Sequence, residues 1–563
     1  MLRYIVNCPN PSSHFIQIEV IIDGLTPGLP VAVCLPLWRP GRYEMQNYPK
    51  NVRQFKAYDI DGSELIATKT HKGKWQIATK GNCEMRIVYE YYAHQLDAGA
   101  SYVNHAQWYI NPCNCMLYVE GQMNNPCELY INAPNDYEIA ISLPQIADKL
   151  YIADSFHLLA DSPFIASPNL QKETFKLGHC IIYIWFQGNI IYNAEKLLSD
   201  FEKFCKSQLD LFGDLECSEY HFFFQMLPYP FHHGVEHANS TVIAMGPNAN
   251  FNERAFYREF LGISSHEFFH LWNVKRIRPV DMLPYNYETE NYSTLGWVYE
   301  GFTTYYGDLI CIRSGIYSQA EWLETFNKHL QRHFDNAGRY HLTLAQSSFD
   351  TWLDGYSNLV PHRKVNIYTE GLLSAFILDM SIREETDGKN NLDDIMRDMY
   401  AQYKNGVGYS LNSIKQMCET ITQKSCGWFF DEVINGCGYI EQYLPDALQI
   451  AGLSIQVSPN NNPIERVFGF KYILAAKGWQ ISAIWPGSAA YSAGLDIDDI
   501  IVSINGQPNT NEVFADDIPV LASIILEVEN LGVKRILNIA PTHEDYYSIY
   551  SVNIIDEAAF GKL

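Results

Sequence analysis

The feature that most constrains this chain is the sequence HEFFH at residues 266–270. Residues four positions apart on an α-helix share one face and are offset by roughly 6 Å along the axis, so His266 and His270 can reach a single metal ion. Glu267 then lies beside the open coordination position, where a carboxylate can take a proton from the attacking water. The pattern predicts a zinc-binding helix with Glu267 as the general base.

The residues around this motif predict that the helix is buried. Residues 252–275 show a helical period of bulky apolar side chains, among them Phe260, Phe268 and Leu271. The alternative is a pair of core histidines that bind backbone carbonyls. Burial of the polar side chains of His266, Glu267 and His270 costs free energy unless they have partners. A bound metal ion would be such a partner, so this cost favours the metal site.

A zinc hydrolase needs a third protein ligand, and Glu300 is the acid that the sequence favours. It lies among aromatic and apolar residues at the start of a second predicted helix, over residues 297–313, so it is expected to be buried and to need a partner. That partner is either zinc or a nearby Lys or Arg. The acids that follow the motif are Asp281, Glu288, Glu290, Glu300 and Asp308.

These motifs resemble the PDZ-containing glycyl aminopeptidases, which are thermolysin-like zinc metallopeptidases (gluzincins). The resemblance rests on HEFFHLWNVKRIRP at 266–279, WVYEGFTTYY at 297–306 and the amino-terminal LPLWRPGRY at 35–43, and it extends over nearly the whole chain. It implies a hydrolase that binds one zinc ion through His266, His270 and Glu300. It also implies an aminopeptidase that favours small amino-terminal residues such as Gly and Ala.

The resemblance further assigns the substrate's free amine to the segment GVEHANS at 234–240. Glu236 matches the acid that meets the amine in related aminopeptidases, and Gly234 belongs to the same strand edge. An ion pair with the ammonium would fix the register so that only the first peptide bond reaches the metal. The alternative is that Glu236 is an exposed acid on an edge strand. His232, His233 and His237 lie nearby without ligand spacing, so a second metal is not expected.

A tyrosine is expected to stabilise the oxyanion of the tetrahedral intermediate. Tyr368, in a segment similar to the family's Tyr-x-x-Gly, matches the transition-state tyrosine of related enzymes. The family usually has a lysine before this glycine, whereas this chain has Glu370. The chain contains 38 tyrosines, so a purely structural role for Tyr368 also stays open.

The sequence predicts a multidomain α+β protein with three regions. Short alternating runs over residues 1–189, including 15–22, 83–92 and 180–186, indicate an antiparallel β domain. Helical periods dominate 190–445, the expected thermolysin-like catalytic domain, with helices at 194–212, 319–335 and 371–384 besides those above. Strands and turns return in 446–563.

The last region resembles a PDZ domain, on GWQISAIWPGSAA at 478–490 and AGLDIDDIIVSING at 493–506. Phe468, Gly469 and Phe470 stand where the carboxylate-binding loop would be, so their N–H groups would receive a peptide's carboxy terminus. A helix somewhere in 512–528 should wall the groove, although its sequence departs from the usual pattern. The alternative is a module that only packs on the catalytic domain.

Composition supports a folded enzyme and excludes some partners. The 563 residues are 47% hydrophobic and 14% aromatic, with a net charge of −24. That charge argues against nucleic acid and anionic membranes as partners, and no apolar run is long enough for a transmembrane helix. The start of the chain lacks a secretory signal, so a cytoplasmic protein is expected if the mature chain begins at Met1.

These observations predict a zinc aminopeptidase that acts on peptides with a free amino terminus. One rival is an endopeptidase whose PDZ domain recruits protein carboxy termini. Another is a non-enzymatic binding protein with a catalytically inactive zinc site. The presence of Glu267 disfavours it, because an inactive site does not need a general base.

Overall fold

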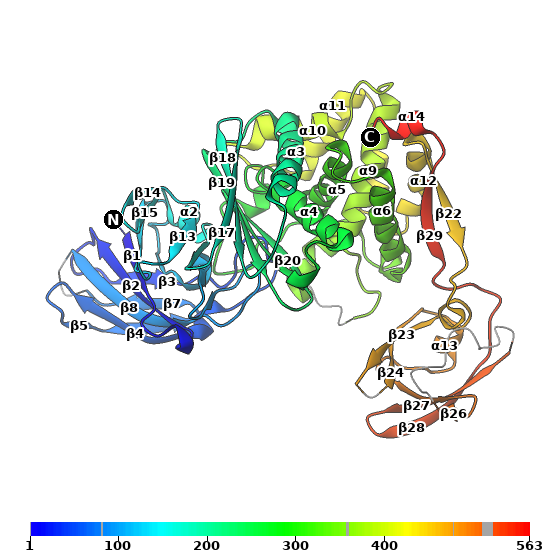
Figure 1. The fold of residues 1–563 in the computed structure, drawn as a ribbon, viewed down its shortest axis with the longest axis horizontal. Coiled ribbons are helices and arrows are strands. Elements are labelled where there is room, and N and C mark those ends of the chain that lie inside the picture. The colour runs from blue at the N-terminus through cyan, green and yellow to red at the C-terminus, as the bar shows by residue number, and fades with distance from the viewer. Residues whose placement is uncertain (1, 80, 82, 356–359, 477, 509–521) are drawn as a thin grey trace. The chain divides into compact units, whose positions relative to one another are not determined.

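The computed structural model describes residues 2–79, 81, 83–355, 360–476, 478–508 and 522–563 (Figure 1). Its first part consists of strands, as the alternating sequence predicts. In β2 (Phe15–Asp23), Ile16, Ile18, Val20 and Ile22 are buried and the positions between them are more exposed. A period of two places these side chains on one face of the sheet, where they form part of a large hydrophobic core.

This amino-terminal region contains three sheets. The largest has the order β14-β15-β12-β1-β2-β8-β4-β5, in which every pair is antiparallel except β1 with β12. The others have the orders β13-β16-β10-β9 and β11-β3-β7-β6. The remaining strands are β1 (Leu2–Asn7), β3 (Val31–Cys34), β4 (Val52–Asp59), β5 (Glu64–Leu65), β6 (Ala67–His71), β7 (Lys74–Ile77), β8 (Glu84–Tyr92), β9 (Tyr102–Val103), β10 (Trp108–Ile110), β11 (Tyr118–Val119), β12 (Cys127–Ile131), β13 (Glu138–Ile141), β14 (Gln145–Ala147), β15 (Leu150–Ala153) and β16 (Phe164–Ser167).

A five-stranded sheet of order β17-β18-β19-β21-β20 follows. Its strands are β17 (Gln171–Leu177), β18 (Cys180–Gln187), β19 (Glu219–Met226), β20 (Phe231–His237) and β21 (Ser240–Gly246). Residues 180–186, predicted as a strand, belong to β18, which pairs antiparallel with β17 and in parallel with β19. The domain boundary at residue 189 stays a prediction.

The two faces of this sheet pack against different neighbours. On one face, Phe223 of β19 and Val235 of β20 share a core with residues of the amino-terminal region. On the other, Phe222 and Phe224 meet aromatic residues of the helices α3 (Ala194–Phe212) and α4 (Arg254–Phe269). The same alternation turns Gly234 and Glu236, the neighbours of Val235 on the edge strand β20, toward the helix side.

The helices lie close to where the sequence places them. α3 has the predicted bounds, and the second predicted helix comprises a π-helical segment, η5 (Trp297–Phe302), continued by α5 (Thr303–Arg313). α4 ends at Phe269, six residues before the predicted end. Two more helices, α10 (Leu392–Tyr403) and α11 (Leu411–Thr422), pack together, and α10 also packs on α3. Two short helices are α1 (Pro112–Cys115) and α2 (Phe156–Ala160).

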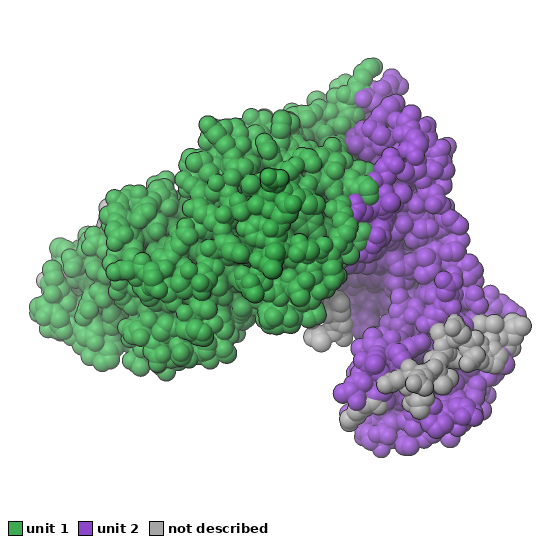
Figure 2. All heavy atoms as spheres, in the orientation of Figure 1, with its two compact units in different colours: residues 1–318, 348–357, 389–424 green, residues 319–347, 358–388, 425–563 purple. Residues whose placement is uncertain are grey.

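The chain forms two compact units, which Figure 2 shows in different colours. The first contains residues 1–318, 348–357 and 389–424, and so holds every element described above. The second contains residues 319–347, 358–388 and 425–563. Its helices include α6 (Gln319–Phe334), α9 (Ile367–Glu385) and α12 (Ile440–Ile450), and both α6 and α12 pack on α9. Within the described ranges, no helix is long and apolar enough to cross a membrane.

The second unit also holds the carboxy-terminal strands. β22 (Leu453–Ser458) pairs with β29 (Ile549–Ile554), and a further sheet has the order β23-β24-β25-β27-β28 with a small core of its own. Its strands are β23 (Phe470–Ala475), β24 (Gly478–Ile484), β25 (Ile500–Ile504), β27 (Ile524–Asn530) and β28 (Val533–Ile539), and β26 (Gln507–Pro508) pairs with β25. The helix expected in 512–528 falls largely on residues 509–521, which lie outside the described residues. From residue 524 the chain is strand β27, so no helix occupies that end of the range.

Candidate active site

Two histidines leave the carboxy-terminal end of α4 on the same face. His266 belongs to the last turn and His270 caps the helix, and their Nε2 atoms lie 3.1 Å apart. Helix α5 passes close beneath them, because a Cβ at Gly307 would lie 3.2 Å from the Cα of His266. A glycine at this position therefore allows the two helices to pack closely under the first histidine.

Glu300, in the π-helical segment η5, completes a set of three ligands. Its Oε2 lies 3.8 Å from Nε2 of His266 and 3.5 Å from Nε2 of His270. Three donors that each lie about 2.1 Å from a tetrahedral zinc ion are about 3.4 Å from one another, close to these separations. The donor atoms and their spacing therefore fit zinc. Glu300, the acid that the sequence favours as third ligand, forms a candidate metal group with both histidines.

Neighbouring residues orient the ligands. Nδ1 of His270 lies 2.7 Å from the carbonyl oxygen of Asn273, which can only accept, so Nδ1 carries a proton and Nε2 faces the metal site. The side chain of Asn273 in turn donates to the carbonyl of Val298 at 2.9 Å and to Oγ1 of Thr303 at 3.1 Å. This asparagine thus connects the turn after α4 to the segment that carries Glu300.

Tyr43, from the amino-terminal region, donates a hydrogen bond from its hydroxyl to Oε1 of Glu300 at 2.7 Å. The side chain is 1% exposed, and its ring packs on Tyr299 with centroids 5.3 Å apart. Because Oε1 is engaged, Oε2 is the oxygen that faces the histidines. The sequence analysis gave Tyr43 no role, although it lies in the quoted segment at 35–43.

The charges of the three candidate ligands strongly shift one another's pKa values. Burial disfavours the charged form of Glu300, but the neighbouring imidazoles of His270 and His266 outweigh it and lower the pKa of Glu300 to about 2. Burial likewise opposes a charged His270, yet the carboxylates of Glu300, Glu236 and Glu267 raise its pKa to about 10. Burial lowers the pKa of His266. Before a metal binds, a proton on His270 therefore supplies part of the positive charge that the metal ion would bring.

Glu267 lies against the edge strand β20. A Cβ at Gly234 would lie only 2.1 Å from Oε1 of Glu267, so the carboxylate occupies the space that a side chain at residue 234 would fill. The hydroxyl of Thr241 contacts the other oxygen at 3.5 Å. Burial, reinforced by the charges of Glu236 and Glu300, raises the pKa of Glu267 to about 8. A buried carboxyl group with a pKa near neutrality is suited to accept and return a proton.

Glu236 is 4% exposed, which excludes the interpretation as a surface acid. Its Oε1 has no hydrogen-bond partner among the described residues. On the other side, a Cβ at Gly41 would lie 2.3 Å from Oε2 of Glu236. Glu236, Glu267 and His270 place side-chain donor atoms within 4.8 Å of one another, so Glu236 adjoins the metal ligands. A buried carboxylate oxygen without a partner is expected to bind a cation from a ligand.

The other histidines near residue 236 have protein partners. His237 lies 3.0 Å from the carboxylate of Asp161, which is also 2.6 Å from Nζ of Lys275. His233 accepts a hydrogen bond from the amide of Ala98, and burial lowers its pKa to about 4. Neither candidate metal group found in the described ranges includes any of the three histidines at 232, 233 and 237.

Several aromatic residues near the motif are buried and pack on other core residues. Trp272 stacks on Phe212 with centroids 4.6 Å apart and donates to the carbonyl of Asp214. Trp297 and Phe302 are fully buried and pack on each other. The ring of Tyr299 packs on Tyr43, which contacts the ligand Glu300.

Tyr368 lies in the second compact unit, in the first turn of α9, where Asn366 caps the helix. Glu370, the acid in place of the family's lysine, is buried there. Both of its oxygens lie within 2.9 Å of Nδ1 of His333. The departure from the family pattern therefore places a buried acid beside the ring of His333 inside this unit.

Phe468, Gly469 and Phe470 lie where β23 begins, at the edge of the carboxy-terminal sheet. Gly469 has a φ of +75°, and its N–H donates to the carbonyls of Ile464 and Glu465 at 3.2 and 3.1 Å. The N–H of Gly469 therefore caps the preceding helical turn, and binding of a peptide carboxy terminus by this segment stays a prediction.

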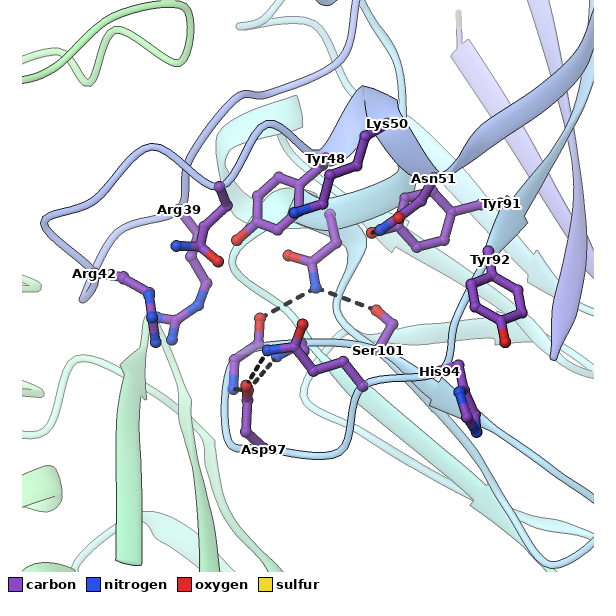
Figure 3. Close-up of a pocket in the computed structure, with 15 residues that line it drawn as sticks. Arg39, Arg42, Tyr48, Lys50, Asn51, Tyr91, Tyr92, His94, Asp97 and Ser101 are labelled. Carbon is purple, nitrogen blue, oxygen red and sulfur yellow. Dashed lines mark hydrogen bonds between the residues drawn. The ribbon is translucent and has the colours of Figure 1, made fainter. Parts of the chain in front are cut away.

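A separate cavity of about 180 Å³ lies in the amino-terminal region (Figure 3). Arg39 and Arg42 stand at one end of it, with Tyr92 and His94 at the other. Asp97 projects from a loop whose amides at Gly99 and Ala100 bind its carboxylate. Among the described residues that line the cavity, none belongs to the metal cluster.

Three parts of the chain match models of known protein families. Residues 3–168 match the Peptidase M61 N-terminal domain, residues 259–374 match M61 glycyl aminopeptidase, and residues 444–513 match the PDZ domain. No curated protein matches the chain.

Among solved structures, the chain is similar over its whole length to an aminopeptidase N family protein from Idiomarina loihiensis. The sequences are 24% identical, the alignment covers 100% of this chain and 99% of that one, and the TM-score is 0.93. This likeness shows the fold. An M1 zinc metallopeptidase from Deinococcus radiodurans is 13% identical over 77% of this chain and 93% of its own, with a TM-score of 0.48.

Proposed function

The chain belongs to the M61 glycyl aminopeptidase family, and from this premise we propose that it removes small amino-terminal residues from peptides with one zinc ion held by His266, His270 and Glu300. The metallopeptidase class follows from the family. The observation that supports the assignment of residues is a set of three donors at separations suited to zinc, next to a buried acid with an oxygen that lacks a protein partner.

Lewis acidity toward the scissile carbonyl is the chemistry that bound zinc supplies. Glu267 takes the proton of the attacking water and passes it to the leaving amine. Its position against Gly234 supports this role, because the absence of a side chain at residue 234 leaves room for the carboxylate beside the ligand set.

Glu236 binds the substrate's ammonium. Its free Oε1 accepts from the amine, and the backbone of β20, with Gly234, lies beside the first substrate residue. An ion pair in a site shielded from water holds the amino terminus in one register, so that only the first peptide bond reaches the metal ligands.

Tyr368 is the proposed donor to the oxyanion. The support for it is its place in a segment similar to the family's Tyr-x-x-Gly. The preference for Gly or Ala and the recruitment of peptide carboxy termini by the edge of β23 likewise rest on the family and on the PDZ match. The domain boundary at residues 445 and 446 stays a prediction.

The test is release of 7-amino-4-methylcoumarin from glycyl and alanyl derivatives by zinc-loaded protein. Wild type should hydrolyse both, Glu267→Gln should retain zinc and be inactive, and amino-terminal acetylation of the substrate should abolish hydrolysis. Cleavage of internally quenched, amino-blocked peptides would instead favour the endopeptidase. A zinc-loaded protein that cleaves neither type of substrate would contradict the proposal.

A further inference from the structure

One turn of the amino-terminal region touches two functional acids of the site. Residues 40–43 have the sequence PGRY. Tyr43 donates to Oε1 of the ligand Glu300, and Gly41 lies against the carboxylate of Glu236. Each contact joins residues more than 190 positions apart in the chain, and the two acids, Glu236 and Glu300, are almost completely buried.

The neighbours of the turn fix its position. The ring of Tyr43 packs on Tyr299 and on Trp352, with centroids 5.3 and 6.1 Å apart. Trp38, just before the turn, donates from its indole to the carbonyl of Asn286 at 2.6 Å. Packing against these neighbours holds the hydroxyl of Tyr43 in place. Its hydrogen bond to Glu300 therefore costs little additional conformational entropy when a metal binds.

Gly41 is suited to its position in two ways. Its φ is +75°, a conformation that residues with a side chain rarely adopt. A Cβ there would lie 2.3 Å from Oε2 and 2.8 Å from Cδ of Glu236. The absence of a side chain at residue 41 therefore leaves the space that the carboxylate of Glu236 occupies.

We propose that this PGRY turn is a positioning element for both halves of the reaction: Tyr43 orients Glu300 toward zinc, and Gly41 sets the place of the acid that binds the substrate's amine. The inference rests on the proposed function. It makes the amino-terminal domain part of the active site, with separable effects on metal affinity and on substrate affinity.

The first test is zinc affinity, measured by competition with a chelator and without substrate. Tyr43→Phe removes only the hydroxyl and should weaken zinc binding about 10- to 100-fold, the usual effect of losing a partner of a metal ligand. Tyr89→Phe is the matched control, since Tyr89 is also buried and its hydroxyl donates to a carbonyl at 2.6 Å, in the core of the amino-terminal region. Equal zinc affinity in the two variants would overturn the role of Tyr43.

The second test separates the two roles. Gly41→Ala should raise KM for alanyl-methylcoumarin about 10- to 100-fold, because an acid displaced by about 1 Å binds the amine poorly, while zinc affinity stays near that of wild type. Gly24→Ala is its control, as Gly24 has the same φ of +75° with nothing within 4 Å of its Cβ. A KM no higher than that of Gly24→Ala would refute the role of Gly41.

A double-mutant cycle covers the case in which Gly41→Ala is poorly stable. Glu236→Asp shortens the acid and so should be less harmful in the Gly41→Ala protein than in wild type. Additive effects would contradict direct contact between the two residues. Zinc affinity is read without catalysis, so a wild type that binds zinc but does not cleave would count against the proposed function and leave the Tyr43 test intact.

Discussion

Gly234→Ala should inactivate the enzyme by displacing its general base. The glycine does not have a positive φ, so alanine suits the backbone. The new Cβ would lie 2.1 Å from Oε1 and 2.6 Å from Cδ of Glu267, whereas ordinary contact begins at 3.4 Å. The carboxylate must therefore retreat by about 1.3 Å, the difference between 3.4 and 2.1 Å.

A misplacement of this size costs about 100-fold in rate, or about 2.7 kcal/mol of transition-state stabilisation. We expect kcat for alanyl-methylcoumarin to fall by that factor while zinc content stays at one ion per chain. Gly427→Ala is the control, since the nearest atom to its Cβ is Oγ of Ser425 at 3.4 Å. If kcat of zinc-loaded Gly234→Ala lies within about threefold of this control, the argument from contact distance is wrong.

Four further predictions follow from the same contacts. Glu236→Gln should lower kcat/KM about 10- to 150-fold, mainly through KM, because a hydrogen bond between charged groups contributes about 1.5–3 kcal/mol; steady-state kinetics on alanyl-methylcoumarin checks this. In metal-free protein the pKa of His270 is about 10, above its ordinary 6.5, so the stability this group contributes is complete below pH 6.5 and is lost as the pH rises toward 10. The melting temperature of chelator-treated protein should accordingly be lower at pH 9 than at pH 6. Zinc binding at pH 7 should release close to two protons from wild type and close to one from Glu267→Gln, as measured by calorimetry in buffers of different ionisation enthalpy; equal release would contradict a protonated Glu267. Asp161→Asn should destabilise the protein by about 3–5 kcal/mol in denaturant unfolding, because it leaves the charge of Lys275 buried without its partner.

The sequence predicted the parts of the site that local periodicity determines. Spacing along one helix brings His266 and His270 to the same face, and the apolar neighbours of Glu300 indicate a buried acid. Periodicity shows which face of an element is buried but not what packs on it. The contact of Tyr43 with Glu300 depends on tertiary packing, so only its place in the quoted motif could have pointed to it.

The same limit explains the differences in the fold. Strand β18 alternates like the strands before it, and nothing in its own residues shows that it pairs with β19 across the helix α3. α4 was predicted to continue to residue 275 because its apolar period continues. The ring of His270 donates a hydrogen bond to the carbonyl of Asn273, and the side chain of Asn273 donates one to the carbonyl of Val298. These side-chain hydrogen bonds replace helical ones, so the chain leaves the helix after residue 269.

The charges of the site favour the proposed binding of a free amine. Glu236, Glu267 and Glu300 lie close together, and three buried negative charges would repel strongly. At pH 7 without metal, protons on Glu267 and His270 offset part of this negative charge. Bound Zn²⁺ would supply positive charge in place of these protons. The proposed ion pair between the substrate's ammonium and Glu236 would offset more of the negative charge, in addition to the buried guanidinium of Arg39, and a substrate with a blocked amino terminus would lack this ammonium.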